Sequence, residues 1–223
     1  MTGSLAVAKL TVCAAASLTG VFPQVDKAPR YNFAGSDQLA FQITQGAPAD
    51  VYAAASPKYP DQLFVKGLVY KPRVFATNEL VVIVPRANDA NIDSVYDLSR
   101  RGLRIVIGAK GVPVGDYTRK ALAAIGLSAV LKNVVSEETD VKAVVAKVAL
   151  GEADAGFVYR TDARAASDRL TTVKLPPRAR PKIAYEIAIV KATKQLSAAR
   201  AFVARVFSTK GRAALRRAGF GLP

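Results

Sequence analysis

The 223-residue sequence contains no histidine and only one cysteine, Cys13. Without imidazole the chain cannot build a His-based catalytic triad or a His-ligated metal site, and it lacks the most common general base. A single cysteine cannot form an internal disulfide, so cysteine usage does not indicate a redox compartment. No run of about 18 apolar residues occurs, so no membrane-spanning segment is predicted.

Positive charge is abundant. The chain has 32 Lys and Arg against 17 Asp and Glu, a net charge of +15. Such a field attracts anions, whether nucleic acids, acidic membranes or small oxyanions. The basic residues are scattered, and pairs such as Arg100-Arg101 and Arg216-Arg217 never extend into a long tract with interleaved aromatics. This pattern argues against a dedicated nucleic-acid surface. A protein that binds nucleic acid or a membrane surface stays an alternative, supported by the net charge alone.

Strand and helix patterns alternate along the chain, which predicts an α/β fold with largely parallel sheets covered by helices. A hydrophobic content of 51% is ample for a core. Apolar runs predict strands at 9–14, 51–54, 80–84, 104–108, 155–159, 170–174 and 185–190. Helical spacing predicts helices from Ser36 to a stop at Gly46, at 57–66, 114–125 and 140–150, and two more within 197–218 with Thr209 as a cap between them.

Two lobes are predicted from the course of the chain. The polar stretch 75–79, followed by the apolar strand 80–84 and Pro85, is a candidate for the point where the chain leaves one lobe. A return near 185–190 follows the Pro- and Arg-rich loop 176–181. We therefore predict lobe I as residues 1–78 plus 188–223 and lobe II as residues 79–187.

Ser17 and Ser36 each end a strand-like run and begin a helix-like one. At a helix N-terminus a serine hydroxyl lies beside unpaired backbone N–H groups and the positive end of the helix dipole, and together these hold an anion without lysine or arginine. The alternative is that each serine only caps its own helix.

Three further segments add donors of the same kind. Pro113 precedes a predicted helix, which leaves the N–H groups of Val114 and Gly115 unpaired. Thr139 is a suitable N-cap for the helix that follows it. Tyr159 ends a strand, where open α/β sheets bind ligands. Together the segments predict a cage of amides and hydroxyls for a tetrahedral oxyanion.

Six sequence blocks occur in the order seen in molybdate-binding proteins: Ala14-Ala-Ala-Ser17-Leu18, Phe33-Ala-Gly-Ser36, Gln45-Gly-Ala-Pro-Ala-Asp50-Val51, Val112-Pro-Val-Gly115, Gly156-Phe-Val-Tyr159 and Ala218-Gly-Phe220. The chain resembles this family over nearly its whole length. The family comprises the exported substrate-binding components of molybdate ABC importers. The resemblance implies a two-lobed periplasmic-binding-protein fold of type II, each lobe a mostly parallel sheet flanked by helices, with the ligand in the interlobe cleft.

The resemblance also implies which residues bind the anion. Ser17 and Ser36 are each expected to give a hydroxyl and a backbone amide, Val114 and Val141 to give backbone amides, and Tyr159 to give its phenol. The sequence departs from the family pattern in two places. The segment between Ser17 and Ser36 is short and interrupted by Gly20 and Pro23, and Asp37 adds a carboxylate beside the expected site.

The function implied is capture of molybdate or tungstate by neutral donors, hinge closure and delivery to a membrane ABC permease, with no catalysis, cofactor, further metal or nucleic acid and with a monomeric protein. The resemblance implies a periplasmic protein or an extracellular membrane-anchored one. The first eight residues are too short for a complete signal peptide, so we expect the signal segment to be absent from this chain. One alternative is a sulfate- or phosphate-binding protein. Another is a phosphoryl-handling enzyme with Ser17 as nucleophile, although the chain lacks a histidine base and a phosphate loop.

Overall fold

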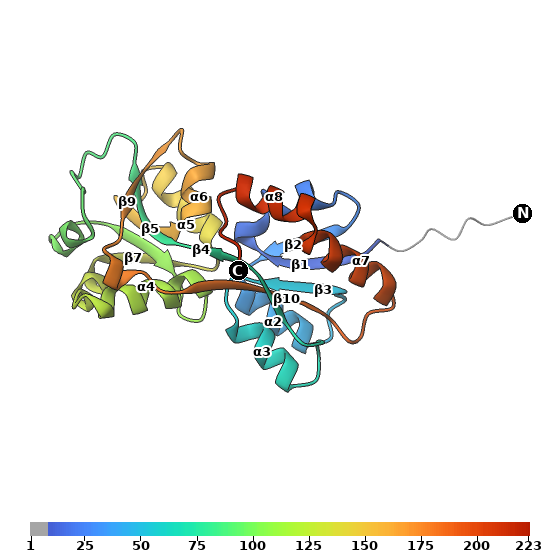
Figure 1. Cartoon of the computed structure of the whole chain (residues 1–223). Helices are drawn as coiled ribbons and strands as arrows, with labels where there is room; N and C mark the ends of the chain where they lie inside the picture. The colour runs from blue at the N-terminus through green and yellow to red at the C-terminus, as the bar shows by residue number, and fades with distance from the viewer. Residues whose placement is uncertain (1–8) are drawn as a thin grey trace, which may run out of the picture.

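The computed structural model describes residues 9–223, so the prediction on the signal segment lies outside the described residues. Two five-stranded mixed sheets lie side by side (Figure 1). The first has the order β2-β1-β3-β10-β4 and the second the order β7-β6-β8-β5-β9. The first sheet contains β1 (Thr11–Ala15), β2 (Arg30–Ala34), β3 (Val51–Ala54), β4 (Arg73–Asn78) and β10 (Ile183–Ile189). The second contains β5 (Leu80–Pro85), β6 (Ile105–Gly108), β7 (Val134–Glu138), β8 (Ala155–Tyr159) and β9 (Leu170–Lys174).

Each sheet is parallel except for one strand. In the first sheet β10 runs antiparallel to both of its neighbours, and in the second β5 does so. The other pairings, β1 with β2 and β3 and β6 with β7 and β8, are parallel. The carboxyl ends of the parallel strands in each sheet therefore lie along one edge, where ligands bind in such folds.

Helices cover both faces of each sheet (Figure 1). In the first lobe α2 (Ser36–Thr44) and α3 (Lys58–Val65) pack together on one face, and α7 (Leu196–Phe207), α8 (Thr209–Arg217) and the short α1 (Phe22–Val25) lie on the other. In the second lobe α4 (Pro113–Ala124) packs on β6 and β8, opposite α5 (Val141–Ala149) and α6 (Arg160–Ala165). Short 3-10 segments η1 (Ala16–Leu18), η2 (Val95–Ser99), η3 (Ser128–Asn133) and η4 (Pro177–Ala179) complete the fold. No helix within residues 9–223 is long and apolar enough to cross a membrane.

The predicted strands and helices are all present, within a few residues at their ends. Three strands have no counterpart in the prediction: β2, β4 and β7. All three are edge strands of their sheets. Because one side of an edge strand is solvated, these strands lack the continuous apolar run that marks the central strands, and β7 alternates between half-buried and exposed residues.

Two predicted helix caps are wrong by one residue. The N-cap of α5 is Asp140, whose carboxylate accepts hydrogen bonds from the N–H groups of Lys142 and Ala143, and not Thr139. The N-cap of α8 is Ser208, whose hydroxyl accepts from the N–H of Gly211, and not Thr209. In both cases two adjacent residues have side chains suited to capping, and only the extended backbone of the first residue outside the helix decides between them.

The chain passes from the first sheet to the second between Asn78 and Leu80, and it returns to the first sheet between Lys174 and Ile183. The division into 1–78 plus 188–223 and 79–187 stays a prediction. Strand β10 pairs with β4 from residue 183 and with β3 from residue 186. We therefore propose that the second segment of lobe I begins at residue 183 and not at residue 188.

Glu186 of β10 gives the fold a pH-dependent stability. Its Oε2 atom is buried and has no hydrogen-bond partner among residues 9–223. Burial, with a smaller contribution from Asp61, raises the pKa of its carboxyl from 4.5 to about 7. Between these values the folded state binds more protons than the unfolded chain, so the free energy of unfolding falls as the pH rises through this range.

Replacing Glu186 by glutamine is therefore expected to stabilise the protein by about 1–2 kcal/mol at about pH 8, less than a full conversion of the shift because the residue is partly exposed. At about pH 4.5, where the native carboxyl is largely protonated, we expect little difference. Thermal unfolding of both proteins across this pH range measures the effect. A stabilisation that is equal at both ends would show that titration of Glu186 is not its cause.

Candidate functional site

All five residues predicted to bind the anion line one narrow cavity between the lobes. Ser17 and Ser36 come from the first lobe, and Val114, Val141 and Tyr159 come from the second. They are 7%, 1%, 1%, 4% and 1% exposed, respectively. The cavity is tight, with a volume of only about 10 Å³. An anion held here is removed from bulk water and must take its hydrogen bonds from the protein.

Ser36 is the first residue of α2, and its hydroxyl does not cap that helix. The N-cap position is occupied by Gly35, and no side-chain cap bond forms. Instead, Ser36 Oγ accepts a hydrogen bond of 3.1 Å from the N–H of Ala55, at the end of the neighbouring strand β3. Since the hydroxyl accepts from the protein, its proton remains available to donate into the cavity.

Ser17 lies in η1, directly after β1, and it too makes no cap bond; Ala15 holds the N-cap position. Its Oγ lies 2.9 Å from the hydroxyl of Tyr185 on β10. The alternative that each serine only caps its own helix is therefore not what the structure shows. The segment after Ser17 is short, as predicted: η1 is followed by one turn of helix, α1, and the chain returns at β2.

Val114 and Val141 lie at the amino ends of two helices, α4 and α5, which meet the cavity. Pro113, the first residue of α4, has no N–H, so Val114 carries the first amide of that helix. At α5 the carboxylate of Asp140 accepts from the second and third amides, at 2.7 and 3.2 Å, which leaves the N–H of Val141 without this partner. The first N–H groups of a helix have no intrahelical acceptor, so both valine amides can serve a ligand.

Tyr159 places an unsatisfied donor in the cavity. Its hydroxyl is buried and has no hydrogen-bond partner among residues 9–223. Burial raises the pKa of this phenol well above its usual range, so it stays protonated. A buried hydroxyl without a partner is unfavourable in the free protein, and an anion in the cavity would satisfy it.

Three carboxylates lie near the cavity, and each is directed elsewhere. Asp140 caps α5. Asp162 is buried and forms an ion pair of 2.7 Å with Lys142, while burial raises the pKa of its carboxyl. Asp37 does not line the cavity; it lies in an adjacent hollow beside its own N–H and that of Gln38, and burial raises its pKa. The acidic neighbour of Ser36 therefore does not line the cavity, and its Oδ1 atom is buried without a hydrogen-bond partner among residues 9–223.

Gly35, which the sequence did not mark, allows the lobes to meet. A Cβ atom built on Gly35 would lie 2.5 Å from the carbonyl oxygen of Thr139 in the opposite lobe and 2.8 Å from Oδ1 of Asp37. No side chain fits between these segments. The signal available in the sequence was a glycine directly before the helix of Ser36, at a position that would also suit an N-cap residue.

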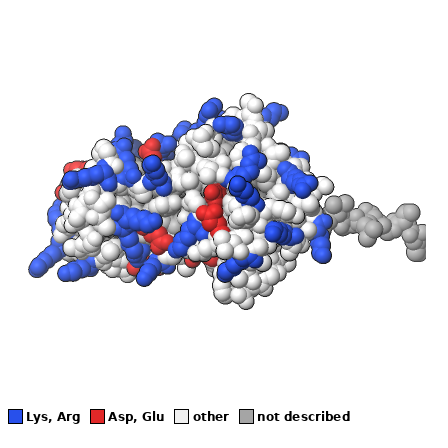
Figure 2. All heavy atoms as spheres, turned by 60° about the horizontal axis from the view of Figure 1, so that its bottom comes forward, with Lys and Arg blue, Asp and Glu red and all other residues white. Residues whose placement is uncertain are grey.

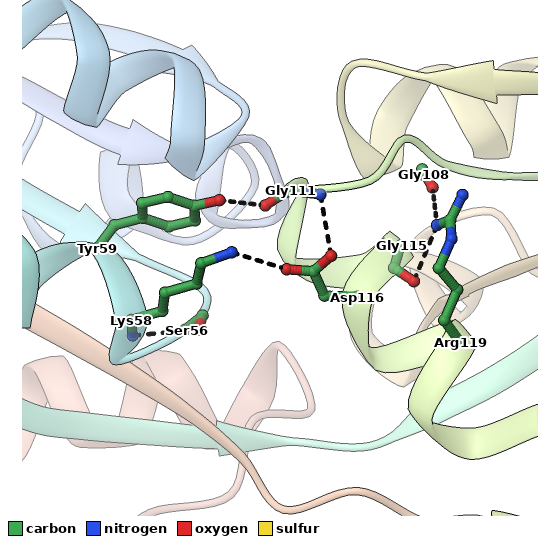
Figure 3. Close-up of polar contacts among 8 residues, drawn as sticks. All are labelled: Ser56, Lys58, Tyr59, Gly108, Gly111, Gly115, Asp116 and Arg119. Atoms are coloured by element: carbon green, nitrogen blue, oxygen red, sulfur yellow. Dashed lines mark hydrogen bonds and ion pairs between the residues drawn. The ribbon is translucent and has the colours of Figure 1, made fainter. Parts of the chain in front are cut away.

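A second contact between the lobes joins α3 to α4 and to the loop before it (Figure 3). Lys58 of α3 pairs with Asp116 of α4 at 3.1 Å, and the hydroxyl of Tyr59 donates to the carbonyl of Gly111. Asp116 also accepts from the N–H of Gly111 at 2.9 Å, so one carboxylate fixes the loop before α4 and binds the opposite lobe. We call Lys58, Tyr59, Gly111 and Asp116 the interlobe contact. Nothing in the sequence pairs these residues.

The interlobe contact is expected to slow ligand release. Replacing Lys58 by methionine removes the ion pair, and replacing Tyr59 by phenylalanine removes the hydrogen bond; each change should raise the dissociation rate about two- to fivefold, because each interaction contributes about 1 kcal/mol or less. Stopped-flow tyrosine fluorescence measures the rate. High salt should abolish the difference for Lys58→Met but not for Tyr59→Phe. Unchanged dissociation in both variants would contradict a role in closure.

A larger hollow, of about 960 Å³, lies elsewhere on the first lobe and is lined by segments around Thr11, Arg30 and Asp50. These residues mark the amino ends of β1, β2 and β3. The narrow cavity instead gathers the carboxyl ends of β1, β2, β3 and β8 and the amino ends of α2, α4 and α5. Since ligands in open α/β sheets bind beyond the carboxyl ends of the strands, the narrow cavity is the candidate site despite its smaller volume.

Similarity to known proteins places the chain in a family. The family model described as bacterial extracellular solute-binding protein matches residues 10–221. The chain belongs to this family. The solute-binding protein is 41% identical to the molybdate-binding protein ModA of Mycobacterium tuberculosis strain H37Rv, over 96% of this chain and 85% of that protein.

Two solved structures show the same fold. The periplasmic molybdate-binding protein of Azotobacter vinelandii superposes with a TM-score of 0.87, at 24% identity, over 96% of this chain and 100% of that chain. The sulfate-binding protein SubI of M. tuberculosis superposes with a TM-score of 0.82, at 19% identity, over 96% and 86% of the two chains. These two likenesses show the fold alone: the predicted two-lobed type II architecture is confirmed.

Proposed function

We propose that this solute-binding protein captures molybdate or tungstate and delivers it to a membrane ABC permease. The observation that carries the proposal is the convergence of uncharged donors on one buried cavity: the hydroxyls of Ser17, Ser36 and Tyr159 and the amides that begin α4 and α5. The name and 41% identity of the M. tuberculosis relative support molybdate as the ligand.

Neutral donors are sufficient to hold a buried dianion. Each hydrogen bond to a charged group contributes about 1.5–3 kcal/mol net of the bonds to water that it replaces, so several preorganised donors together can hold a dianion. The roles of Ser17, Ser36, Val114, Val141 and Tyr159 are part of this proposal. Because the valines act through their N–H groups, Val114→Ala should leave affinity nearly unchanged, whereas Ser36→Ala removes a donor and also deprives the Ala55 N–H of its acceptor.

The proposed mechanism is hinge closure of two lobes around a dehydrated anion, with no chemical step. The scattered basic side chains seen on both lobes (Figure 2) give a positive field that draws anions to the cleft. We propose that the protein works as a monomer outside the cytoplasm and needs no cofactor, further metal or nucleic acid.

Isothermal titration calorimetry with molybdate, tungstate, sulfate and phosphate tests the proposal. We expect tight binding of molybdate and tungstate in the wild type and in Val114→Ala, and a loss of about tenfold or more in Ser17→Ala and Ser36→Ala. Tight binding of sulfate with no response to molybdate would overturn the choice of ligand. Tight molybdate binding that neither serine substitution weakens would overturn the choice of site.

A further inference from the structure

A chain of buried hydrogen bonds lies directly behind Ser17. The hydroxyl of Tyr185 lies 2.9 Å from Ser17 Oγ, and Asn78 Nδ2 donates to that hydroxyl at 3.3 Å. The same Nδ2 donates to Thr161 Oγ1 at 2.9 Å. Asn78 ends β4 and Tyr185 lies in β10, the two strands next to the crossings between lobes, and Thr161 belongs to the second lobe. Of the four residues Ser17, Asn78, Thr161 and Tyr185, only Ser17 lines the cavity.

The orientation of the Asn78 amide is fixed by a fourth bond. Its Oδ1 accepts from the N–H of Glu79 at 2.9 Å, so the other end of the amide, the NH₂ group, faces Tyr185 and Thr161. An NH₂ group has two protons and no accepting lone pair. Both protons are used, and the phenol oxygen of Tyr185 is therefore an acceptor from Asn78.

The direction of the next bond follows from this one. Burial raises the pKa of the Tyr185 phenol well above its usual range, so the hydroxyl keeps its proton. The ring is held by the rings of Phe75, Tyr159 and Phe220, with centroids 6.1, 5.8 and 5.4 Å away. Because the Asn78 NH₂ group cannot accept, Ser17 Oγ is the one partner of this hydroxyl among residues 9–223 that can take its proton, so we infer that Tyr185 donates to Ser17. Ser17 then accepts from the protein, and its own proton is free for the cavity.

We propose that Asn78 and Tyr185 are positioning residues that hold Ser17 as a hydrogen-bond donor, and that they thereby select fully deprotonated oxyanions over anions that carry a proton, such as hydrogen phosphate. The inference rests on the proposed function of the site. Ser36 is fixed in the same sense by the N–H of Ala55. A fully deprotonated dianion accepts at every oxygen, whereas the P–OH group of hydrogen phosphate needs an acceptor that these two serines do not offer.

The substitution Asn78→Asp tests the direction of the chain. A carboxylate retains the bond from the Glu79 N–H but has no proton to give, so Tyr185 donates to it, and Ser17 donates to Tyr185. Ser17 then presents lone pairs to the cavity and can accept from P–OH. The added negative charge weakens the binding of every dianion, so the readout is the ratio of the dissociation constants for molybdate and hydrogen phosphate. This ratio is measured by competition at about pH 8, where both anions are mainly dianions.

The matched control is Asn133→Asp. Asn133 Nδ2 also donates two hydrogen bonds, to the carbonyls of Leu98 and Arg100, and it does not line the cavity. We expect the ratio of the dissociation constants, molybdate over hydrogen phosphate, to rise at least about tenfold in Asn78→Asp and to stay at the wild-type value in Asn133→Asp. If this ratio does not rise in Asn78→Asp, for instance because both anions lose affinity equally, the inference is overturned.

Tyr185→Phe gives a second test that introduces no charge and decides the matter if Asn78→Asp does not fold. It removes the donor to Ser17, so the serine hydroxyl can turn and accept, and the same ratio should rise about threefold or more. An unchanged ratio overturns the inference. A wild-type protein that binds no oxyanion would instead overturn the proposed function, before any variant is compared.

Discussion

Replacing Gly35 by alanine is expected to weaken oxyanion binding about ten- to a hundredfold while leaving the free protein folded. The added Cβ would lie 2.5 Å from the Thr139 carbonyl oxygen, closer than packed carbon and oxygen atoms approach. Because the oxygen belongs to the backbone of the opposite lobe, the lobes themselves must separate to relieve the clash. Overpacking of this kind costs about 1–3 kcal/mol, which corresponds to the stated loss of affinity.

The backbone of Gly35 does not itself require glycine. Its φ of −57° and ψ of 138° are accessible to alanine, so the local backbone is not strained. The contact with Asp37 Oδ1 can be relieved by rotation of that side chain, whereas the contact with the Thr139 backbone strains the closed arrangement of the lobes. Gly20→Ala is the control, because a Cβ there would meet no atom within 4 Å. Calorimetry gives the affinity, and thermal unfolding without ligand gives the stability. Wild-type affinity in Gly35→Ala would show that closure does not need the close approach of Gly35 and Thr139.

The central strands and most helices could be predicted because they carry the periodic apolar signal. β3, β5 and β8 are almost wholly buried and read as continuous apolar runs. β2 and β7 could not be found in this way, since one side of each is open and their residues alternate in burial. Their positions follow from pairing with β1 and β6, which is a tertiary property.

In the candidate site, too, the local features could be predicted from the sequence and the tertiary contacts could not. Ser17 and Ser36 were predicted because strand, serine and helix follow one another in the sequence. What lies behind the serines was not predicted, because Tyr185 is 168 residues from Ser17 and Ala55 is 19 from Ser36. Local chemistry therefore indicates which groups can bind an anion, whereas the direction of each hydroxyl proton is set by partners that only the fold brings together.

Tyr159→Phe is expected to separate binding from stability, with effects of opposite sign. The Tyr159 hydroxyl is buried and has no hydrogen-bond partner within the part of the chain that the structure describes, so its removal should leave stability unchanged or raise it by up to about 1 kcal/mol. The ring, 5.8 Å from that of Tyr185, keeps its packing. In the complex the same change removes a hydrogen bond to a dianion, and affinity should fall about ten- to a hundredfold.

Tyr31→Phe is the matched control, because the same atom is removed from a hydroxyl that does have partners. Tyr31 donates to the carbonyls of Phe22 and Asp26, at 3.1 and 2.5 Å, and does not line the cavity. We expect it to lower the melting temperature and to leave molybdate affinity unchanged. Thermal unfolding with and without molybdate measures both effects, since a ligand bound only to the folded state raises the melting temperature according to its affinity. If Tyr159→Phe lowers the melting temperature without ligand as Tyr31→Phe does, the Tyr159 hydroxyl already has a hydrogen-bond partner in the protein without ligand. That result would contradict its proposed role as a donor kept free for the anion.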